Sequence, residues 1–251
     1  VVPTDATVLA LGGASWPRLG SDGGWVPALS AAGVRVAPLR PANCGFVVDW
    51  TPAFADRFAG AQLKNVGLTH GSASARGDAI VTTTGIEGGA VYAVAAPLRD
   101  AIGAGRRAIL AVDLRPDMAA EVIAQRLVAG RARDSTSSRL RRAGLRAVEA
   151  GLLREATGNR LALDPAAMAR LVKSVELRVV GVQPIDRAIS SAGGVALDEV
   201  DGSFMLRRRP GTFVAGEMLD WEAPTGGYLL QATFSTAVAA ADGVLAWLGR
   251  P

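Results

Sequence analysis

Two glycines, Gly226 and Gly227, stand directly before a long apolar segment that has the composition of a helix. The first turn of a helix has backbone N–H groups without partners and carries the positive end of the helix dipole. Glycines have no side chains, so they let a ligand approach these N–H groups closely. The Pro-Thr-Gly-Gly corner at 224–227 therefore predicts a place where an electron-rich group binds. A simple sharp turn into the helix is the alternative.

A carboxylate stands ten residues before Gly227, at the end of the strand-like run TFVAGE. The Glu217 carboxylate can accept strong hydrogen bonds from the hydroxyl groups of a ligand. It can also simply be an exposed group at a turn. Because Glu217 and the glycine corner are so close in sequence, we consider them parts of one candidate ligand site.

Other common chemistries are poorly represented in the chain. Cys44 is the only cysteine, which excludes a disulfide framework and a cysteine-ligated metal cluster within one chain. His70 is the only histidine, it has no accompanying G-x-S-x-G motif, and its polar surroundings predict a loop. The sequence therefore assigns no catalytic residue and no metal ligand.

One match to a dinucleotide fingerprint occurs, at Gly103, Gly105 and Ala108. The fingerprint works only when its glycines follow a strand and begin a helix. Here they follow a helix-like stretch and precede the strand-like run AILAVDL, so we interpret them as the glycine-capped end of a helix.

The composition indicates a folded protein with a substantial core, because 49% of the 251 residues are hydrophobic. The net charge is +4, yet only two of the 27 basic residues are lysines, which is typical of GC-rich coding bias. The charge is therefore weak support for nucleic-acid binding. No apolar run reaches the ~18 residues of a membrane-spanning helix, so we expect no membrane association and a cytoplasmic location.

The order of elements predicts an α/β protein with a β-rich insert. A buried strand at 7–11, a helix at 21–32 and a strand at 34–39 form a βαβ-like opening. Residues 44–114 contain short alternating runs, typical of a small antiparallel or barrel-like module, interrupted by a helix near 89–103. The last part predicts strands in VELRVVGV, GGVAL and TFVAGE and a final helix over 228–248.

Residues 117–174 have helical patterns, including a continuous one over 140–156 and a last helix with Asp164 as N-cap and Pro165 in its first turn. This segment is rich in arginine: Arg131, Arg133, Arg139, Arg141, Arg142 and Arg146. A stacking platform for nucleic acid needs aromatic side chains between the basic ones, and none occurs there. We therefore favour a solvated helical face.

Two segments resemble the flavin-binding motifs of the glutathione-reductase-like class, which are a strand ending in Ala-Thr-Gly and a later strand ending in Gly-Asp or Gly-Glu. These segments are TVLALGG at 7–13 and GTFVAGE at 211–217. Together with LALGGASWPRLGSDGGW, RPANCGF, RGDAIVTTTGIEGGAVY, AISSAGGVAL and PTGGY, they resemble the YhiN-like flavoproteins, a group that includes enzymes named aminoacetone oxidases.

The resemblance implies a partial glutathione-reductase-like FAD-binding fold with a β-barrel-like insert and a small helical subdomain. The flavin-binding α/β domain would consist of 1–43 and 189–251, the barrel of 44–115 and 175–188, and the helical subdomain of 116–174. Family members begin with a strand, a glycine-rich fingerprint and a helix, which lie upstream of the point where this sequence begins. We therefore expect a truncated form of a longer enzyme.

The resemblance also implies roles for individual residues around FAD. Glu217 would accept hydrogen bonds from the ribityl hydroxyls, and Gly216 would let the ribityl chain pass. Gly12 and Gly13 would lie beside the dinucleotide, and Ser15, Trp16 and Pro17 would form a wall facing the flavin. Thr225, Gly226 and Gly227 would lie at the N1–O2 edge of the flavin ring. Tyr228 and Leu229 would lie beneath the ring.

The resulting prediction is an FAD-dependent oxidoreductase that acts on a small-molecule substrate, with NADH or NADPH as a candidate electron donor. The alternative is a non-catalytic binding module that uses the arginine-rich helical segment on an anionic partner. A partnership with nucleic acid is disfavoured by the missing aromatic residues.

Overall fold

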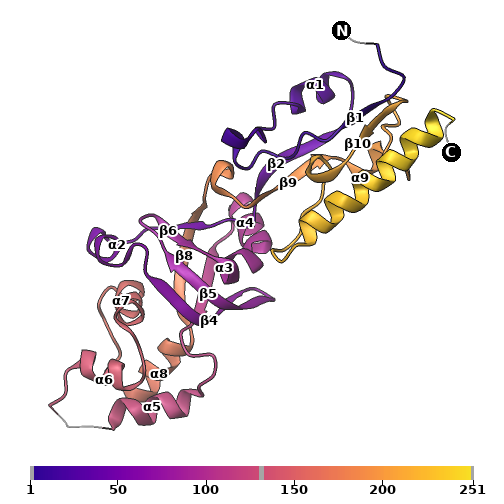
Figure 1. Cartoon of the computed structure of the whole chain (residues 1–251). Coiled ribbons are helices and arrows are strands. Elements are labelled where there is room, and N and C mark those ends of the chain that lie inside the picture. The colour runs from indigo at the N-terminus through magenta and orange to yellow at the C-terminus, as the bar shows by residue number, and fades with distance from the viewer. Residues whose placement is uncertain (1–2, 130–132, 250–251) are drawn as a thin grey trace. The chain divides into compact units, whose positions relative to one another are not determined.

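The computed structural model describes residues 3–129 and 133–249. The chain forms two compact units, which we call the α/β unit (Val1–Cys44 with Gln183–Pro251) and the barrel unit (Gly45–Val182). Figure 1 labels their elements. The α/β unit is therefore built from both ends of the sequence, while the barrel unit is continuous. The division into three domains stays a prediction.

The α/β unit contains two small sheets. Strand β1 (Thr7–Leu9) pairs in parallel with β10 (Thr212–Val214), and β2 (Val36–Ala42) pairs antiparallel with β9 (Ser190–Val195). The expected βαβ opening is therefore wrong: β1 and β2, on either side of helix α1 (Val26–Ala31), belong to different sheets. Local pattern identified strand and helix positions, but the partners of both strands lie far away in the sequence.

Two groups of apolar side chains form the core of the α/β unit. The larger group contains Trp25, Leu29, Val34, Val195, Val200, Leu206, Val214, Met218 and Leu219. The smaller one contains Phe213, Ala215 and Ala240. Leu9 of strand β1 packs against the larger group but is itself only partly buried, and Val8 is 48% exposed. The expectation of a buried first strand is therefore wrong, because among the described residues only the β10 edge of β1 is paired.

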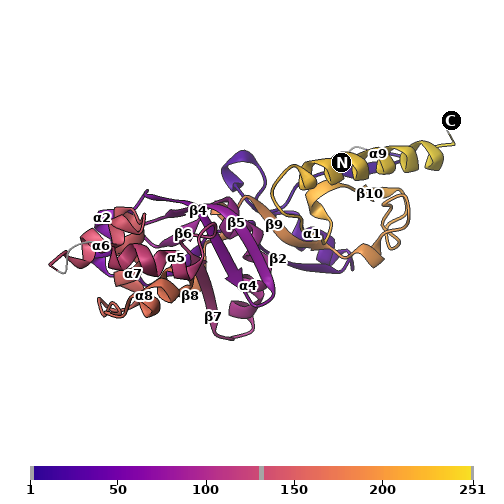
Figure 2. The ribbon, with the colours of Figure 1, turned by 90° about the horizontal axis from the view of Figure 1, so that it is seen from below.

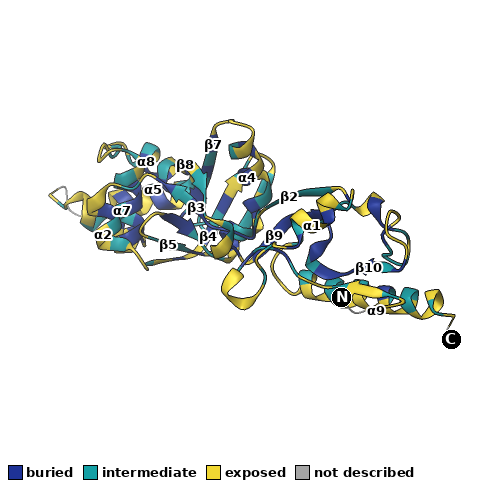
Figure 3. Cartoon of the chain, turned by 90° about the horizontal axis from the view of Figure 1, so that it is seen from above, coloured by how far each residue is buried: buried dark blue, intermediate teal, exposed yellow. Residues whose placement is uncertain are grey.

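Helix α9 (Tyr228–Trp247) is the final helix, as the sequence predicted. It contacts β10 and the short 3-10 turn Gly216–Met218, and Gly243 lets it approach Phe213, since a Cβ there would lie 2.8 Å from the ring. Its opposite side is exposed (Figure 3). Among the described residues α9 alone is long and apolar enough to cross a membrane. The expectation that no segment meets this criterion is therefore wrong.

The barrel unit contains a closed six-stranded barrel, in agreement with the expected β-rich insert. Around the barrel the order is β3 (Phe46–Val48), β6 (Gly85–Glu87), β5 (Ala73–Val81), β4 (Gln62–His70), β7 (Ala108–Asp113) and β8 (Val175–Val182). Side chains of β7 are alternately buried and partly exposed, as the wall of a closed barrel requires. His70 ends β4 and its Nδ1 lies 2.8 Å from the Ile109 carbonyl, so the expectation of a loop histidine is wrong.

Helices α3 (Gly89–Ala93) and α4 (Ala95–Gly103) lie where a helix was predicted. Gly105 follows α4 with a φ of 66°, and its N–H donates to the Ile102 carbonyl. The apparent dinucleotide fingerprint is therefore the end of a helix, as expected.

Between β7 and β8, the described residues form helices α5 (Ala120–Val128), α6 (Thr136–Arg142), α7 (Ala147–Ala156) and α8 (Pro165–Lys173). Asp164 caps α8, accepting a hydrogen bond of 2.7 Å from the Ala167 N–H. The expected continuous helical pattern over 140–156 is broken at Gly144, which has a φ of 89° and separates α6 from α7. Arg131 lies outside the described residues.

A further helix, α2 (Pro52–Phe58), had no counterpart in the sequence prediction. It begins at Thr51, whose hydroxyl accepts a hydrogen bond from the Phe54 N–H. The helix contacts α7, and Figure 2 shows the two close together. Helix α2 therefore joins the helical part of the barrel unit although it lies far from α7 in the sequence.

Candidate functional site

The α/β unit has a hollow of about 430 Å³ next to the start of α9. Its walls come from the end of β1, the beginning of β9, the turn after β10 and the Pro-Thr-Gly-Gly corner. Of the predicted site residues, it is lined by Gly12, Gly216, Glu217, Thr225, Gly226, Gly227 and Leu229. Segments at both ends of the sequence thus meet around one cavity.

Glu217 lies in this hollow with one of its two carboxylate oxygens fixed. Oε1 accepts a hydrogen bond of 2.8 Å from the Ser191 backbone N–H, at the start of β9. Within the described part of the chain, Oε2 has no hydrogen-bond partner, and the side chain is only partly buried. One oxygen therefore anchors the carboxylate, and the other can accept a hydrogen bond from a ligand.

Gly13 makes room for this arrangement. A Cβ at this position would lie 2.4 Å from Ser191 Oγ, which is closer than real Cβ atoms approach, and 3.0 Å from Glu217 Cδ, which is a tight contact. The neighbouring Ala14 N–H donates to Ser191 Oγ at 2.8 Å. The turn after β1, Ser191 and Glu217 thus form one connected group, although Gly13 itself does not line the hollow.

The glycine corner supplies the start of α9. Gly226 and Gly227 have φ values of 116° and 91°, a conformation that side chains with a Cβ rarely adopt. A Cβ on Gly227 would meet no atom within 4 Å, so open space lies beside it. The N–H of Gln231 makes the first intrahelical bond, to the Gly227 carbonyl, and the preceding N–H groups remain for a ligand or solvent.

The remaining predicted residues lie outside this hollow. Ser15 is buried, Trp16 is half-buried and Pro17 is exposed. Trp16 has a φ of 57°, and the Arg18 guanidinium lies 4.7 Å from its ring centroid. Tyr228 is 63% exposed and lines a separate surface hollow beside α9.

Several residues of the hollow had no role in the sequence prediction, chief among them Asn43. Its Nδ2 donates to Ser190 Oγ (2.9 Å) and to the Ala223 carbonyl (2.7 Å), so it ties the start of β9 to the segment before the glycine corner. The segment RPANCGF contained one signal for Asn43, because asparagine is one of the few residue types that tolerate a positive φ. Asn43 has a φ of 48°. Its partners, however, are remote in sequence.

Side chains of α9 hold the turn that carries Glu217. The Gly216 N–H donates to Thr236 Oγ1 at 3.0 Å, and Thr233 lines the hollow. Ile189, Leu229 and Leu230 add apolar surface. Among the described lining residues Glu217 is the only ionisable one. The hollow thus combines one carboxylate, exposed backbone N–H groups and apolar walls, which suits a flat ligand with a polar edge and a hydroxylated chain.

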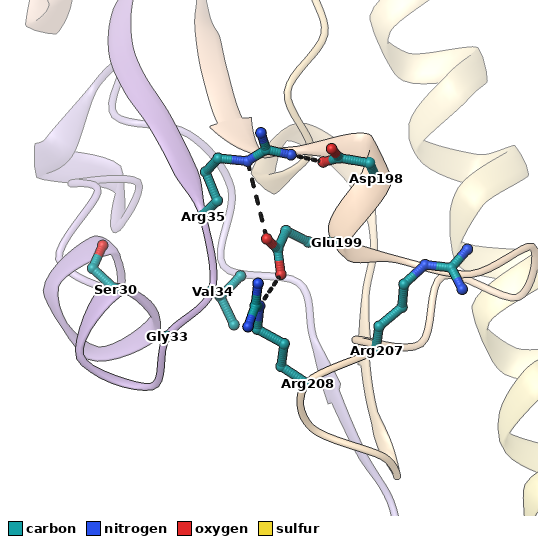
Figure 4. Close-up of a pocket in the computed structure, with 8 residues that line it drawn as sticks. All are labelled: Ser30, Gly33, Val34, Arg35, Asp198, Glu199, Arg207 and Arg208. Carbon is teal, nitrogen blue, oxygen red and sulfur yellow. Dashed lines mark hydrogen bonds and ion pairs between the residues drawn. The ribbon is translucent and has the colours of Figure 1, made fainter.

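A second hollow of the α/β unit has a different character (Figure 4). Glu199 is buried there and accepts a hydrogen bond of 3.0 Å from Arg208 Nε, while Arg35 is ion-paired with Asp198. The hydrogen bond from Arg35 lowers the pKa of Asp198. Because these charges pair with one another, the hollow is better explained as an ion-pair network than as a ligand site.

The comparisons with known proteins identify the family of the chain. No curated protein matches the chain. The family model described as "HI0933-like protein Rossmann domain" matches residues 1–243, which is nearly the whole chain. This chain therefore belongs to the HI0933-like family of proteins with a Rossmann-type α/β domain, the family that includes the YhiN-like FAD-dependent flavoproteins.

Proposed function

We propose that this protein is an FAD-dependent oxidoreductase and that the hollow beside α9 holds the flavin half of the cofactor. The observation that carries the proposal is the position of Glu217. Its unpartnered oxygen lies in the same hollow as the Gly226–Gly227 corner. A hydroxylated chain and a ring with an electron-rich edge need these two features together.

The residues present fit a bound flavin. The open space beside Gly227 and the positive φ values of the corner leave room for a ring edge at the start of α9. The apolar walls suit the flat ring, and the connected group of Gly13, Ser191 and Glu217 holds the carboxylate in place. The proposed fold relation is to the flavin-binding domain of the glutathione-reductase-like class.

Each part of the site has a role in this proposal. Glu217 accepts hydrogen bonds from the ribityl hydroxyls while Gly216 and Gly12 leave space for that chain. The N–H groups at Gly227 and the dipole of α9 favour added negative charge at the ring edge near them. Leu229 packs beneath the ring. Ser15, Trp16 and Pro17 remain proposed as a wall and Tyr228 as a residue beneath the ring, although none of the four lines the hollow.

When bound, FAD supplies hydride transfer, and the protein supplies binding, orientation and electrostatics. We propose a small-molecule substrate and NADH or NADPH as the electron donor. A cytoplasmic location is part of the proposal, and membership of a family with a Rossmann-type domain supports it.

Absorption spectroscopy of the purified protein tests the proposal. We expect flavin bands in the visible spectrum, and we expect the cofactor released by denaturation to be FAD. The Glu217→Gln variant should retain less of it. A protein that neither contains nor takes up FAD would support the alternative, a non-catalytic binding module.

A further inference from the structure

The barrel unit has its own hollow, of about 740 Å³, between α2, α6 and α7. Its floor is apolar and includes Phe54, Phe58 and Leu145. Phe58 fits closely against α7, since a Cβ on Gly151 would lie 2.4 Å from its ring. A cavity of this size with an apolar floor is typical of a ligand site.

The rim of this hollow is strongly basic. It is lined by Arg57 from α2, Arg141 from α6, and Arg146 and Arg154 from the α7 segment. Among the described lining residues Glu155 is the only acidic one. Both oxygens of Glu155 are engaged, because they accept hydrogen bonds from the N–H and hydroxyl of Thr51. The hollow therefore has an excess of positive charge that its own carboxylate does not balance.

The four arginines are not equally available. Arg146 is ion-paired with Glu149 at 2.7 Å, and Arg154 donates to the Ala150 carbonyl and to Ser137 Oγ. Arg57 lies over the Phe58 ring, with its guanidinium 5.3 Å from the centroid, and within the described ranges neither Arg57 nor Arg141 has a carboxylate partner. Both side chains are exposed, so their guanidinium groups are free to bind an anion.

The arginine side chains indicate which chemical class of ligand the hollow binds. An arginine guanidinium presents a planar fork of donors that matches the oxygens of a phosphate, and it also stacks on flat rings. Here guanidinium groups and aromatic side chains line the same hollow, so a phosphate attached to a planar ring satisfies both features. The sequence had no aromatic residue among these arginines, but α2 brings Phe54 and Phe58 to them.

We propose that the hollow between α2, α6 and α7 is a binding site for a phosphate-bearing ligand with a planar ring, and that Arg57 and Arg141 bind its phosphate. A free nucleotide and a nucleotide unit of a single strand share this chemistry. The site is separate from the hollow that holds Glu217, because all of its lining residues belong to the barrel unit.

Calorimetric titration of the full chain with AMP, adenosine and inorganic phosphate tests the proposal. AMP should bind more tightly than adenosine, since only AMP has the phosphate. The Arg57→Glu/Arg141→Glu variant should bind AMP at least about tenfold more weakly, the usual effect of losing charge-assisted contacts. Adenosine and AMP binding equally, or no binding of either, would overturn the proposal.

Arg170 offers a matched control. It is an exposed arginine in α8, outside the hollow and without an ion pair among the described residues. Arg170→Glu should leave AMP binding unchanged, and a loss as large as that of Arg141→Glu alone would show that only net charge matters and would refute the site. The Arg57→Lys/Arg141→Lys variant should bind with intermediate affinity, because it keeps charge but loses the planar fork.

A second titration distinguishes a free nucleotide from a nucleotide unit of a single strand. It uses a single-stranded oligonucleotide of about ten nucleotides, a length that falls within the range bound by known single-strand binding sites. Tighter binding than AMP together with weaker salt dependence in the double variant indicates a strand. Binding no tighter than AMP indicates a free nucleotide. The flavin content should be the same in all variants, so failure of this site is distinguishable from failure of the proposed flavin site.

Discussion

The Ser191 N–H donates to Glu217 Oε1 at 2.8 Å, across 26 residues of sequence. This bond fixes one oxygen of the only ionisable side chain among the described residues of the hollow and leaves the other for a ligand. Because Ser191 Oγ also accepts from Ala14, the same residue joins the turn after β1 to the carboxylate. Ser191 therefore supports the proposed site from behind, because it links the turn after β1 to the Glu217 carboxylate.

Replacing Glu217 with glutamine tests the carboxylate. The shape is kept and the charge is removed, so FAD affinity should fall by about 1 to 2 kcal/mol, the difference between a charge-assisted and a neutral hydrogen bond. Asp242→Asn, at an exposed carboxylate of α9, is the control and should bind FAD normally. Equal affinities in a fluorescence titration would mean that Glu217 does not contact the ribityl chain.

A valine at Gly227 tests the helix start. The φ of 91° is unfavourable for valine, and its side chain would occupy the open space in which we place the ring edge. Flavin retention should be lost. Gly33→Val is a matched control, because Gly33 has a φ of 80° and a Cβ there would also meet no atom within 4 Å, but it lies outside the hollow.

Both valine variants should lose a similar amount of thermal stability, since each suffers the same type of backbone strain. Only Gly227→Val should lose flavin, measured as the absorbance ratio of flavin to protein. Retained flavin in Gly227→Val, or equal loss in Gly33→Val, would contradict a contact at the corner.

Alanine at Gly13 tests the steric fit against Ser191 and Glu217. Its Cβ would lie 2.4 Å from Ser191 Oγ, so overpacking should cost about 1–3 kcal/mol of unfolding free energy. Removing the Ser191 side chain in Gly13→Ala/Ser191→Gly should recover part of that loss. A chemical-denaturation double-mutant cycle measures the coupling, and additive effects would show that the two side chains do not clash.

Acid should destabilise the barrel unit through Glu149, whose side chain is buried and accepts hydrogen bonds from Arg115 and Arg146. Burial alone raises its pKa, but these bonds outweigh burial and hold the pKa below the ordinary value of 4.5. The stabilisation is therefore complete above that value and is lost as the pH falls through the lowered pKa.

Glu149→Gln should remove this part of the pH dependence. At pH 7 it should cost about 3 kcal/mol, because it leaves Arg115 without its buried partner. Urea denaturation of both proteins between neutral and acidic pH measures the effect, and the two stability curves should converge at low pH. Parallel curves would assign the acid sensitivity to other groups.

The sequence by itself determined the elements whose signals are local. Strand β8 and helices α8 and α9 were predicted nearly to the residue, because alternation, an aspartate N-cap and a glycine corner act over a few neighbouring positions. The same applies to Glu217 and the Gly226–Gly227 corner, which are close enough in sequence to be recognised together. The closed barrel was also indicated by a series of short alternating strands.

Only the tertiary structure decided which segments that are distant in sequence contact one another. Strand β1 pairs with β10 instead of forming a βαβ unit with β2. Asn43 lines the hollow and Ser191 holds Glu217 behind it, each by contacts with segments that are not adjacent in sequence. Helix α2 likewise carries Phe58 to Gly151, which places an aromatic floor among arginines that had seemed to lack one. Such contacts depend on packing and on hydrogen bonds between distant parts of the chain, and neither leaves a periodic pattern in the sequence.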